Sequence, residues 1–134
     1  GHFFCAEEYF PFDDALKTAL QVLRILHNAG GKPFSHLFHA FPQVYQSPER
    51  RPHCPDEQKA AIIARVKEHF LQGFPVETMD GVRIDFGEGS WAGIRQSNTS
   101  PCISVCIEAR TPKKLAEVES LVLGHLRQYS EIQW

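Results

Sequence analysis

The chain has 134 residues, a formal net charge of -2, and a composition of 43% hydrophobic and 22% charged residues. These values are typical of one globular domain with a small appendage, and they argue against a disordered, collagenous or disulfide-stapled protein. The charge balance gives no basic field for nucleic acid, and the sequence has no long apolar run or signal-like start, which predicts a cytoplasmic protein with reduced cysteines and no membrane partner.

The first forty residues predict a small helical unit. Leucines at helical spacing follow Asp13 and Asp14, whose charges favour the start of a helix, and Gly30-Gly31 ends the pattern. A second apolar pattern covers residues 34–41 and stops before a proline. Two such helices are too few to stabilise themselves, so we expect their apolar faces to pack on another surface. Prolines between residues 46 and 55 then predict an extended linker or edge strand, and with it a domain boundary.

The rest of the chain predicts a helix, a meander of strands and a second helix. Pro55 and the acidic residues after it favour a helix start, and Gly73 marks its end. The apolar period then changes to two over residues 82–86 and again over residues 103–107, as in half-buried strands. Glycines between these runs suit hairpin turns, and Thr111-Pro112 begins a last amphipathic helix. We therefore predict an α+β fold, with a three- to four-stranded antiparallel sheet and two helices on one face.

The bend between the last two strands, residues 93–101, combines one arginine with small hydrogen-bonding side chains. An arginine presents a planar fork of donors that matches two phosphate oxygens, and hydroxyl and amide groups can serve the remaining lone pairs. The bend is therefore a candidate oxyanion site formed by Arg95, Ser97, Asn98 and Thr99. From the residues alone, an ordinary polar turn with local side-chain-to-backbone hydrogen bonds explains the stretch equally well.

Four segments of the C-terminal part occur in the order found in a known family. They are an Asp-Gly-Val strand at 80–86, a Gly-Ser-Trp turn at 89–91, an Arg-Gln-Ser-Asn-Thr-Ser-Pro loop at 95–101 and a Glu-Ala strand end at 108–109. Together they resemble the last domain of the α-D-phosphohexomutases, and the most similar subgroup is phosphomannomutase/phosphoglucomutase. The resemblance implies that residues 44–134 are a phosphate-binding domain with a fold like that of the TATA-box-binding protein.

The N-terminal part resembles the end of the third domain of the same family. The matching residues are Gly1-His2-Phe3-Phe4, Glu8, Tyr9 and Phe12-Asp13-Asp14-Ala15. In the family, the positions of Gly1 and His2 end a sugar-recognition loop with the pattern G-E-M-S-G-H. The resemblance implies that residues 1–43 are the helical remnant of an α/β domain, and that the sequence is part of a longer protein.

The resemblance also implies a reaction, the reversible interconversion of hexose 6-phosphate and hexose 1-phosphate through a phosphoserine and a bisphosphorylated sugar. In that reaction the loop residues Arg95, Ser97, Asn98 and Thr99 would bind the substrate phosphate. His2 would be a candidate general acid/base, since the usual pKa of histidine suits proton transfer near neutral pH. The alternative for His2 is a flexible terminus, which its terminal position favours. The sugar stays open among glucose, mannose and N-acetylglucosamine.

Two segments that the family uses for catalysis have no counterpart in this sequence. They are the loop with the phosphorylated serine and the aspartate-rich loop that binds magnesium. We therefore expect Mg²⁺ in the intact enzyme but no metal or cofactor within this chain, and we expect the chain alone to be inactive. Its partners would be a hexose phosphate and the missing N-terminal domains, rather than nucleic acid or a membrane. The alternative function is that of a stand-alone, non-catalytic α+β binding or interaction module.

Overall fold

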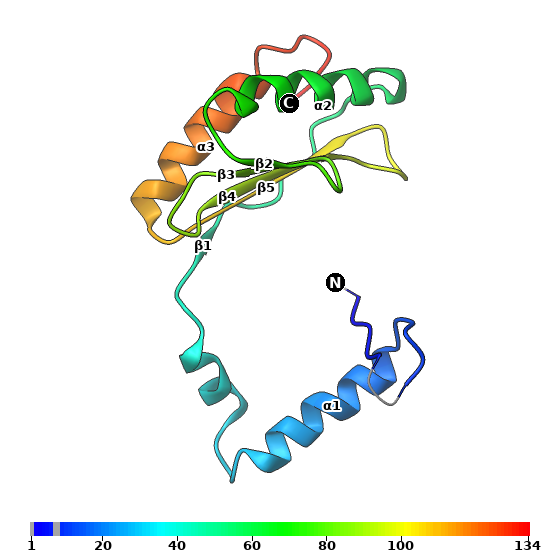
Figure 1. Cartoon of the computed structure of the whole chain (residues 1–134), viewed down its shortest axis with the longest axis vertical. Coiled ribbons are helices and arrows are strands. Elements are labelled where there is room, and N and C mark those ends of the chain that lie inside the picture. The colour runs from blue at the N-terminus through cyan, green and yellow to red at the C-terminus, as the bar shows by residue number, and fades with distance from the viewer. Residues whose placement is uncertain (1, 7–8) are drawn as a thin grey trace. The chain divides into compact units, whose positions relative to one another are not determined.

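The computed structural model describes residues 2–6 and 9–134. Gly1 and Glu8, which contribute to the N-terminal resemblance, lie outside these residues. The chain divides into two compact units, Gly1–Pro42 and Gln43–Trp134. Figure 1 shows their helices and strands.

The first unit contains two helical segments, α1 (Ala15–Asn28) and the 3₁₀ helix η1 (Phe34–Ala40). Asp14 caps α1, because its carboxylate accepts a hydrogen bond of 2.9 Å from the backbone N–H of Lys17. The hydroxyl of Tyr9 donates to the same carboxylate, and these two bonds hold the pKa of Asp14 below its usual range. Neither helix has a buried residue. The predicted helix at 34–41 is confirmed in position, but it takes the tighter 3₁₀ form.

The second unit is an antiparallel sheet covered on one face by two helices (Figure 1). Its strands lie in the spatial order β1-β5-β4-β3-β2, and every neighbouring pair is antiparallel. The elements in chain order are β1 (Tyr45–Gln46), α2 (Asp56–Leu71), β2 (Val76–Glu77), β3 (Val82–Asp85), β4 (Trp91–Gln96), β5 (Ile103–Ala109) and α3 (Pro112–Leu126). This confirms the predicted α+β fold. The sheet has five strands rather than three or four, because two short edge strands flank the predicted meander.

The core of the second unit lies between the sheet and its two helices. Inward-facing strand residues meet the apolar stripes of α2 and α3, and the most fully buried of these side chains include Ile62, Phe70, Ile84, Ile94, Ile107 and Leu126. Alternation along the strands places the neighbouring residues on the opposite face, which carries the polar groups. The hairpin turns predicted at the glycines between the strands are confirmed, because Gly81 and residues 87–89 have positive φ angles.

Strand β5 is more deeply buried than its alternating pattern predicts. Ser104, on the face away from the helices, is only 5% exposed. The chain between β1 and α2 runs beside this strand, with bridges from Arg50 to Val105 and from His53 to Cys102. That segment therefore extends the sheet beyond β5, and the carboxylate of its Glu49 accepts a hydrogen bond from Ser104 on this face. Among the helices of the described residues, none has both the length and the apolar character needed to cross a bilayer.

Candidate functional site

The loop between β4 and β5 is short and closed by its own backbone. The N–H of Ser97 donates to the carbonyl of Cys102 at 3.0 Å, and the N–H of Cys102 donates to the carbonyl of Ser100 at 2.8 Å. The N–H of Thr99 also donates to the hydroxyl oxygen of Ser97 at 3.4 Å. This last bond is one that an ordinary polar turn would make, so it does not by itself indicate a ligand.

The loop forms one side of a pocket with a volume of about 260 Å³. Arg95 is paired in register with Ser104 of β5, and both side chains lie on the face of the sheet away from the helices. The structure brings together the residues predicted from the sequence, and the full lining is Arg51, Asp80, Arg95, Gln96, Ser97, Asn98, Thr99 and Ser104. Arg95, Asn98 and Thr99 are exposed, so their donor groups are open to a ligand from solvent.

Lys59 of α2 fixes the loop from the inside of the fold. Its ammonium group donates to the carbonyls of Ser97 and Ser100, the latter at 3.0 Å, and lies 2.7 Å from the carboxylate of Asp56. Lys59 is 6% exposed, which is rare for lysine unless the charge is paired. Lys59 was not predicted from the sequence. A signal was present, because Lys59 lies three residues before Ile62 and so shares the apolar stripe of the helix.

The turn before β3 positions Arg95 from the side. Asp80 lies 3.2 Å from the guanidinium of Arg95, and both side chains are largely exposed. Gly81 follows with a φ of 82°, and a Cβ atom there would come within 2.4 Å of the carbonyl oxygen of Ile94 and 2.8 Å of the Cβ of Arg95. Only glycine allows this close approach. The exposed carboxylate of Asp80 is a weak partner for Arg95, so an anion in the pocket can compete with it for the guanidinium.

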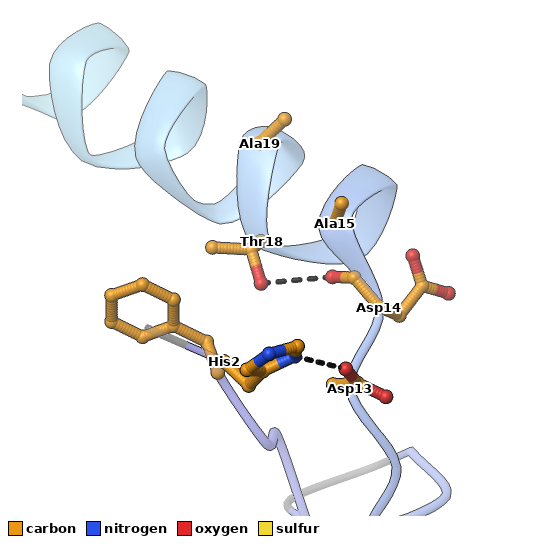
Figure 2. Close-up of a pocket in the computed structure, with 7 residues that line it drawn as sticks. His2, Asp13, Asp14, Ala15, Thr18 and Ala19 are labelled. Carbon is orange, nitrogen blue, oxygen red and sulfur yellow. Dashed lines mark hydrogen bonds and ion pairs between the residues drawn. The ribbon is translucent and has the colours of Figure 1, made fainter. Parts of the chain in front are cut away.

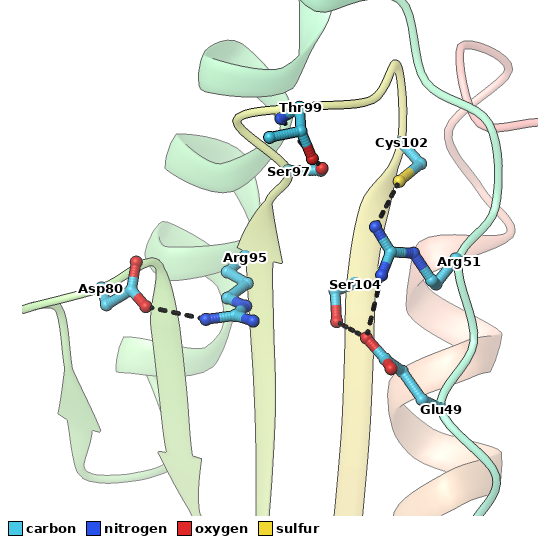
Figure 3. Close-up of polar contacts among 8 residues, drawn as sticks. All are labelled: Glu49, Arg51, Asp80, Arg95, Ser97, Thr99, Cys102 and Ser104. Atoms are coloured by element: carbon cyan, nitrogen blue, oxygen red, sulfur yellow. Dashed lines mark hydrogen bonds and ion pairs between the residues drawn. The ribbon is translucent and has the colours of Figure 1, made fainter. Parts of the chain in front are cut away.

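A second arginine lies across the pocket from Arg95, on the other side of β5 (Figure 3). Arg51 belongs to the segment between β1 and α2, and its guanidinium lies 3.7 Å from the sulfur of Cys102 and 3.9 Å from the carboxylate of Glu49. The same Glu49 carboxylate accepts a hydrogen bond of 2.5 Å from the hydroxyl of Ser104. Arg51 was not predictable from the sequence, because only the pairing of this segment with β5 brings it to the loop.

His2 belongs to the first unit and lines a pocket of its own, with a volume of about 330 Å³ (Figure 2). Its ring nitrogen Nδ1 contacts the carboxylate of Asp13, and its side chain is 76% exposed. The contact places His2 close to the start of α1, beside Thr18.

A comparison with models of known protein families identifies the family of this chain. Residues 51–124 match the family model described as phosphoglucomutase/phosphomannomutase, C-terminal domain. The chain belongs to this family. Its second unit contains the matched residues, including the loop that carries Arg95 and the helix that carries Lys59.

Curated members of the phosphoglucomutase/phosphomannomutase family extend the match to the first unit. The phosphomannomutase/phosphoglucomutase of Pseudomonas aeruginosa is 33% identical over 128 residues, which cover 95% of this chain and 27% of that protein. The phosphoglucomutase/phosphomannomutase of Thermococcus kodakarensis is 34% identical over 116 residues, which cover 86% of this chain and 25% of that protein. The chain thus spans about a quarter of the length of these relatives.

A solved structure of the same family gives an independent comparison of fold. A phosphoglucomutase/phosphomannomutase family protein from Burkholderia thailandensis matches with a TM-score of 0.79 and 24% sequence identity, over 100% of this chain and 28% of that one. At this level of identity the likeness shows the fold alone. It agrees with the α+β architecture described above.

The described residues of this family member do not fit the magnesium site that the family implies. Mg²⁺ is held by carboxylates arranged for octahedral coordination. Across residues 2–6 and 9–134, no three His, Cys, Asp or Glu side chains gather closely enough to hold a metal ion. The acidic residues nearest the pocket, Glu49 and Asp80, lie instead beside arginines.

Proposed function

We propose that the second unit binds the phosphate group of a hexose phosphate, as the C-terminal domain of an enzyme that interconverts hexose 6-phosphate and hexose 1-phosphate. The observation that carries this proposal is the pocket of about 260 Å³ that gathers Arg95, Ser97, Asn98 and Thr99. In the family's reaction a phosphoserine and a bisphosphorylated sugar are intermediates, so the same pocket must accept a phosphate from either end of the sugar.

The chemistry of the pocket suits reversible binding of a phosphate. The guanidinium of Arg95 can donate two parallel hydrogen bonds to phosphate oxygens, while the hydroxyls of Ser97 and Thr99 reach others. Each charge-assisted hydrogen bond contributes about 1.5–3 kcal/mol. A few such bonds position a dianion without trapping it, and part of their energy is available to close the domain over the substrate.

We propose that His2 acts as a general acid/base or contacts a sugar hydroxyl in the same reaction. The contact between its Nδ1 and the carboxylate of Asp13 supports this role, because a carboxylate at Nδ1 fixes the tautomer and leaves Nε2 to exchange a proton. A histidine oriented by a carboxylate is a common arrangement for proton transfer.

We propose that the Mg²⁺ and the phosphoserine of the intact enzyme belong to segments outside this sequence. The acidic residues nearest the pocket support this division, because Glu49 and Asp80 lie beside arginines rather than beside each other. In this proposal Arg95 and its neighbours hold a phosphate, while the phosphoryl donor comes from other segments of the intact enzyme. The chain alone should therefore bind hexose phosphates and leave them unchanged.

The binding proposal is tested by titrating glucose 1-phosphate into ¹⁵N-labelled protein. We expect shifts in the backbone amides of residues 95–99, and we expect Arg95→Ala to abolish them. Arg127→Ala is a matched control, because Arg127 is an exposed arginine of the same unit that covers the ring of Trp134. Unchanged spectra at millimolar glucose 1-phosphate would refute the proposal for this chain.

The proposed lack of catalysis needs a separate measurement. Purified protein is incubated with glucose 1-phosphate and Mg²⁺, and any glucose 6-phosphate is detected with glucose-6-phosphate dehydrogenase. We expect no NADPH above the level without protein. Steady formation of glucose 6-phosphate, lost in Arg95→Ala, would show that the chain carries a complete active site.

A further inference from the structure

Arg51 lies on the segment that runs beside β5. The backbone of Arg50 pairs with Val105 through two hydrogen bonds of 3.1 and 2.9 Å, and the N–H of Ile103 donates to the carbonyl of Pro52. Between these contacts, Arg51 lies opposite Ser104. Because successive side chains of an extended chain point to opposite faces, Arg50 points toward α3 and Arg51 toward the pocket. The ion pair of Arg50 with Glu119 of α3 agrees with this arrangement.

The donor groups of Arg51 have weak partners in the described chain. Its nearest contacts are a sulfur atom at 3.7 Å and the carboxylate of Glu49 at 3.9 Å. A thiol is a weak acceptor, and 3.9 Å is beyond hydrogen-bond distance for an oxygen. By contrast, Arg65 of α2 donates to Glu131 at 2.7 Å. The guanidinium of Arg51 therefore has N–H groups to offer a ligand in the pocket.

We propose that Arg51 is a second phosphate-binding arginine that faces Arg95 across the same pocket. This inference rests on the proposed function and adds a residue to it. A phosphate monoester has two negative charges and three terminal oxygens near neutral pH, and one guanidinium fork engages two of those oxygens. A second guanidinium from the opposite side engages the third oxygen and offsets the second charge. The cradle is then formed by two segments distant in sequence, the β4–β5 loop and the chain before α2.

Glu49 and Ser104 decide whether Arg51 is available. The hydroxyl of Ser104 donates to Oε1 of Glu49 at 2.5 Å, and the same oxygen forms only a long ion pair of 3.9 Å with Arg51 (Figure 3). A phosphate that enters the pocket competes with Glu49 for the guanidinium. Removing the charge of Glu49 should therefore strengthen phosphate binding, whereas removing that of Arg51 should weaken it.

The test compares two ligands that differ in charge, glucose 6-phosphate and glucose 6-sulfate, whose dissociation constants are measured by NMR titration of the full chain. At pH 7.5 the phosphate ester is mainly a dianion and the sulfate ester a monoanion. We expect Arg51→Ala to raise the Kd for the phosphate about tenfold, and that for the sulfate less, because a second cation matters most to the second charge. Arg51→Lys should recover part of the affinity, and Glu49→Gln should lower the Kd for the phosphate.

The controls separate this inference from the proposed function. Arg83→Ala removes an equal charge from the same face of the sheet, where Arg83 covers the ring of Trp91, and should leave both Kd values unchanged. If the wild-type chain fails to bind glucose 6-phosphate, the proposed function and this inference both fail. If Arg95→Ala abolishes binding while Arg51→Ala leaves the Kd unchanged, or raises it equally for the two esters, the inference about Arg51 alone is overturned.

Discussion

Lys59 is a buried cation whose ammonium group donates hydrogen bonds to the backbone of the β4–β5 loop. Removing an ammonium group from water is unfavourable unless hydrogen bonds and an opposite charge replace the lost hydration. Here two loop carbonyls and the Asp56 carboxylate serve that purpose. The carbonyls of Ser97 and Ser100 point toward α2 to meet Lys59, so the loop is held from behind. Its pocket side then remains open for an anion.

Replacing Lys59 with methionine tests this role at the level of one residue. The variant keeps an unbranched apolar side chain but leaves two carbonyls without their donor, so the free energy of unfolding should fall by about 1–3 kcal/mol. Chemical denaturation measures this change, and hydrogen exchange should speed up at the amides of residues 97–102. Lys67→Met is the control, because Lys67 is exposed on the same helix. Equal stability and exchange in both variants would contradict the role.

The residues of the pocket differ in how far the sequence could predict them. Arg95, Ser97, Asn98 and Thr99 are adjacent in the chain and share a bend, so their residue types and the resemblance predicted them. The pocket also contains Arg51, Asp80 and Ser104 from three other segments, and Lys59 holds the loop from behind. Their proximity depends on strand register and helix packing, which a local pattern does not contain. Whether the loop residues bind phosphate remains a prediction.

At the level of elements, the strands show where a periodic pattern predicts structure. The runs that became β3 and β5 alternate over at least four residues, long enough to distinguish a strand from a helix. The edge strands β1 and β2 have two residues each, which is too short for any period. They exist because the chain passes alongside an established strand, as Val76 does opposite Ile84. Their presence is a property of the sheet rather than of their own residues.

Two stacked histidines join the C-terminal ends of α2 and α3. The rings of His69 and His125 are 3.8 Å apart between centroids and nearly parallel, and Nε2 of His125 lies 2.8 Å from the hydroxyl of Tyr129. Phe70 packs edge-on against the same ring. Burial, together with the neighbouring His69, lowers the pKa of His125 below its ordinary value of about 6.5. The neutral form of His125 is therefore the one that fits between the helices.

This lowered pKa predicts how stability depends on pH. As the pH falls below about 6.5, the unfolded chain takes up a proton at His125 more readily than the folded chain, so the free energy of unfolding should decrease. The loss should continue until the pH passes the folded-state pKa. Denaturation at pH 7.5, 6.5 and 5.5 measures it, and His125→Phe should reduce the slope because the ring can no longer titrate. An NMR titration giving a folded-state pKa of His125 at or above 6.5 would contradict the argument.

At the level of the whole molecule, the two units differ in what holds them together. Among residues 2–6 and 9–134, the deeply buried apolar side chains all belong to the second unit, from Cys54 to Ile132. The first unit, in its described residues, has no buried side chain, and apolar residues such as Phe10 and Leu16 are mostly exposed. Since burial of apolar surface is the main source of folding free energy, the second unit should account for most of the stability. The helix patterns of the first unit were predictable, but this difference in burial became visible only in the structure.

Deleting residues 1–42 tests whether the second unit carries the stability of the chain. The remaining chain, Gln43–Trp134, retains the whole core and every strand of the sheet, so it should unfold in one cooperative transition. Its midpoint, measured by circular dichroism, should lie within about 4 °C of that of the full chain, since a change under about 0.5 kcal/mol shifts a domain of this size no further. The separate peptide of residues 1–42 should show no cooperative transition, because its described residues form no buried core. A fall in the midpoint of more than about 8 °C, equivalent to at least about 1 kcal/mol, would show that the first unit stabilises the second.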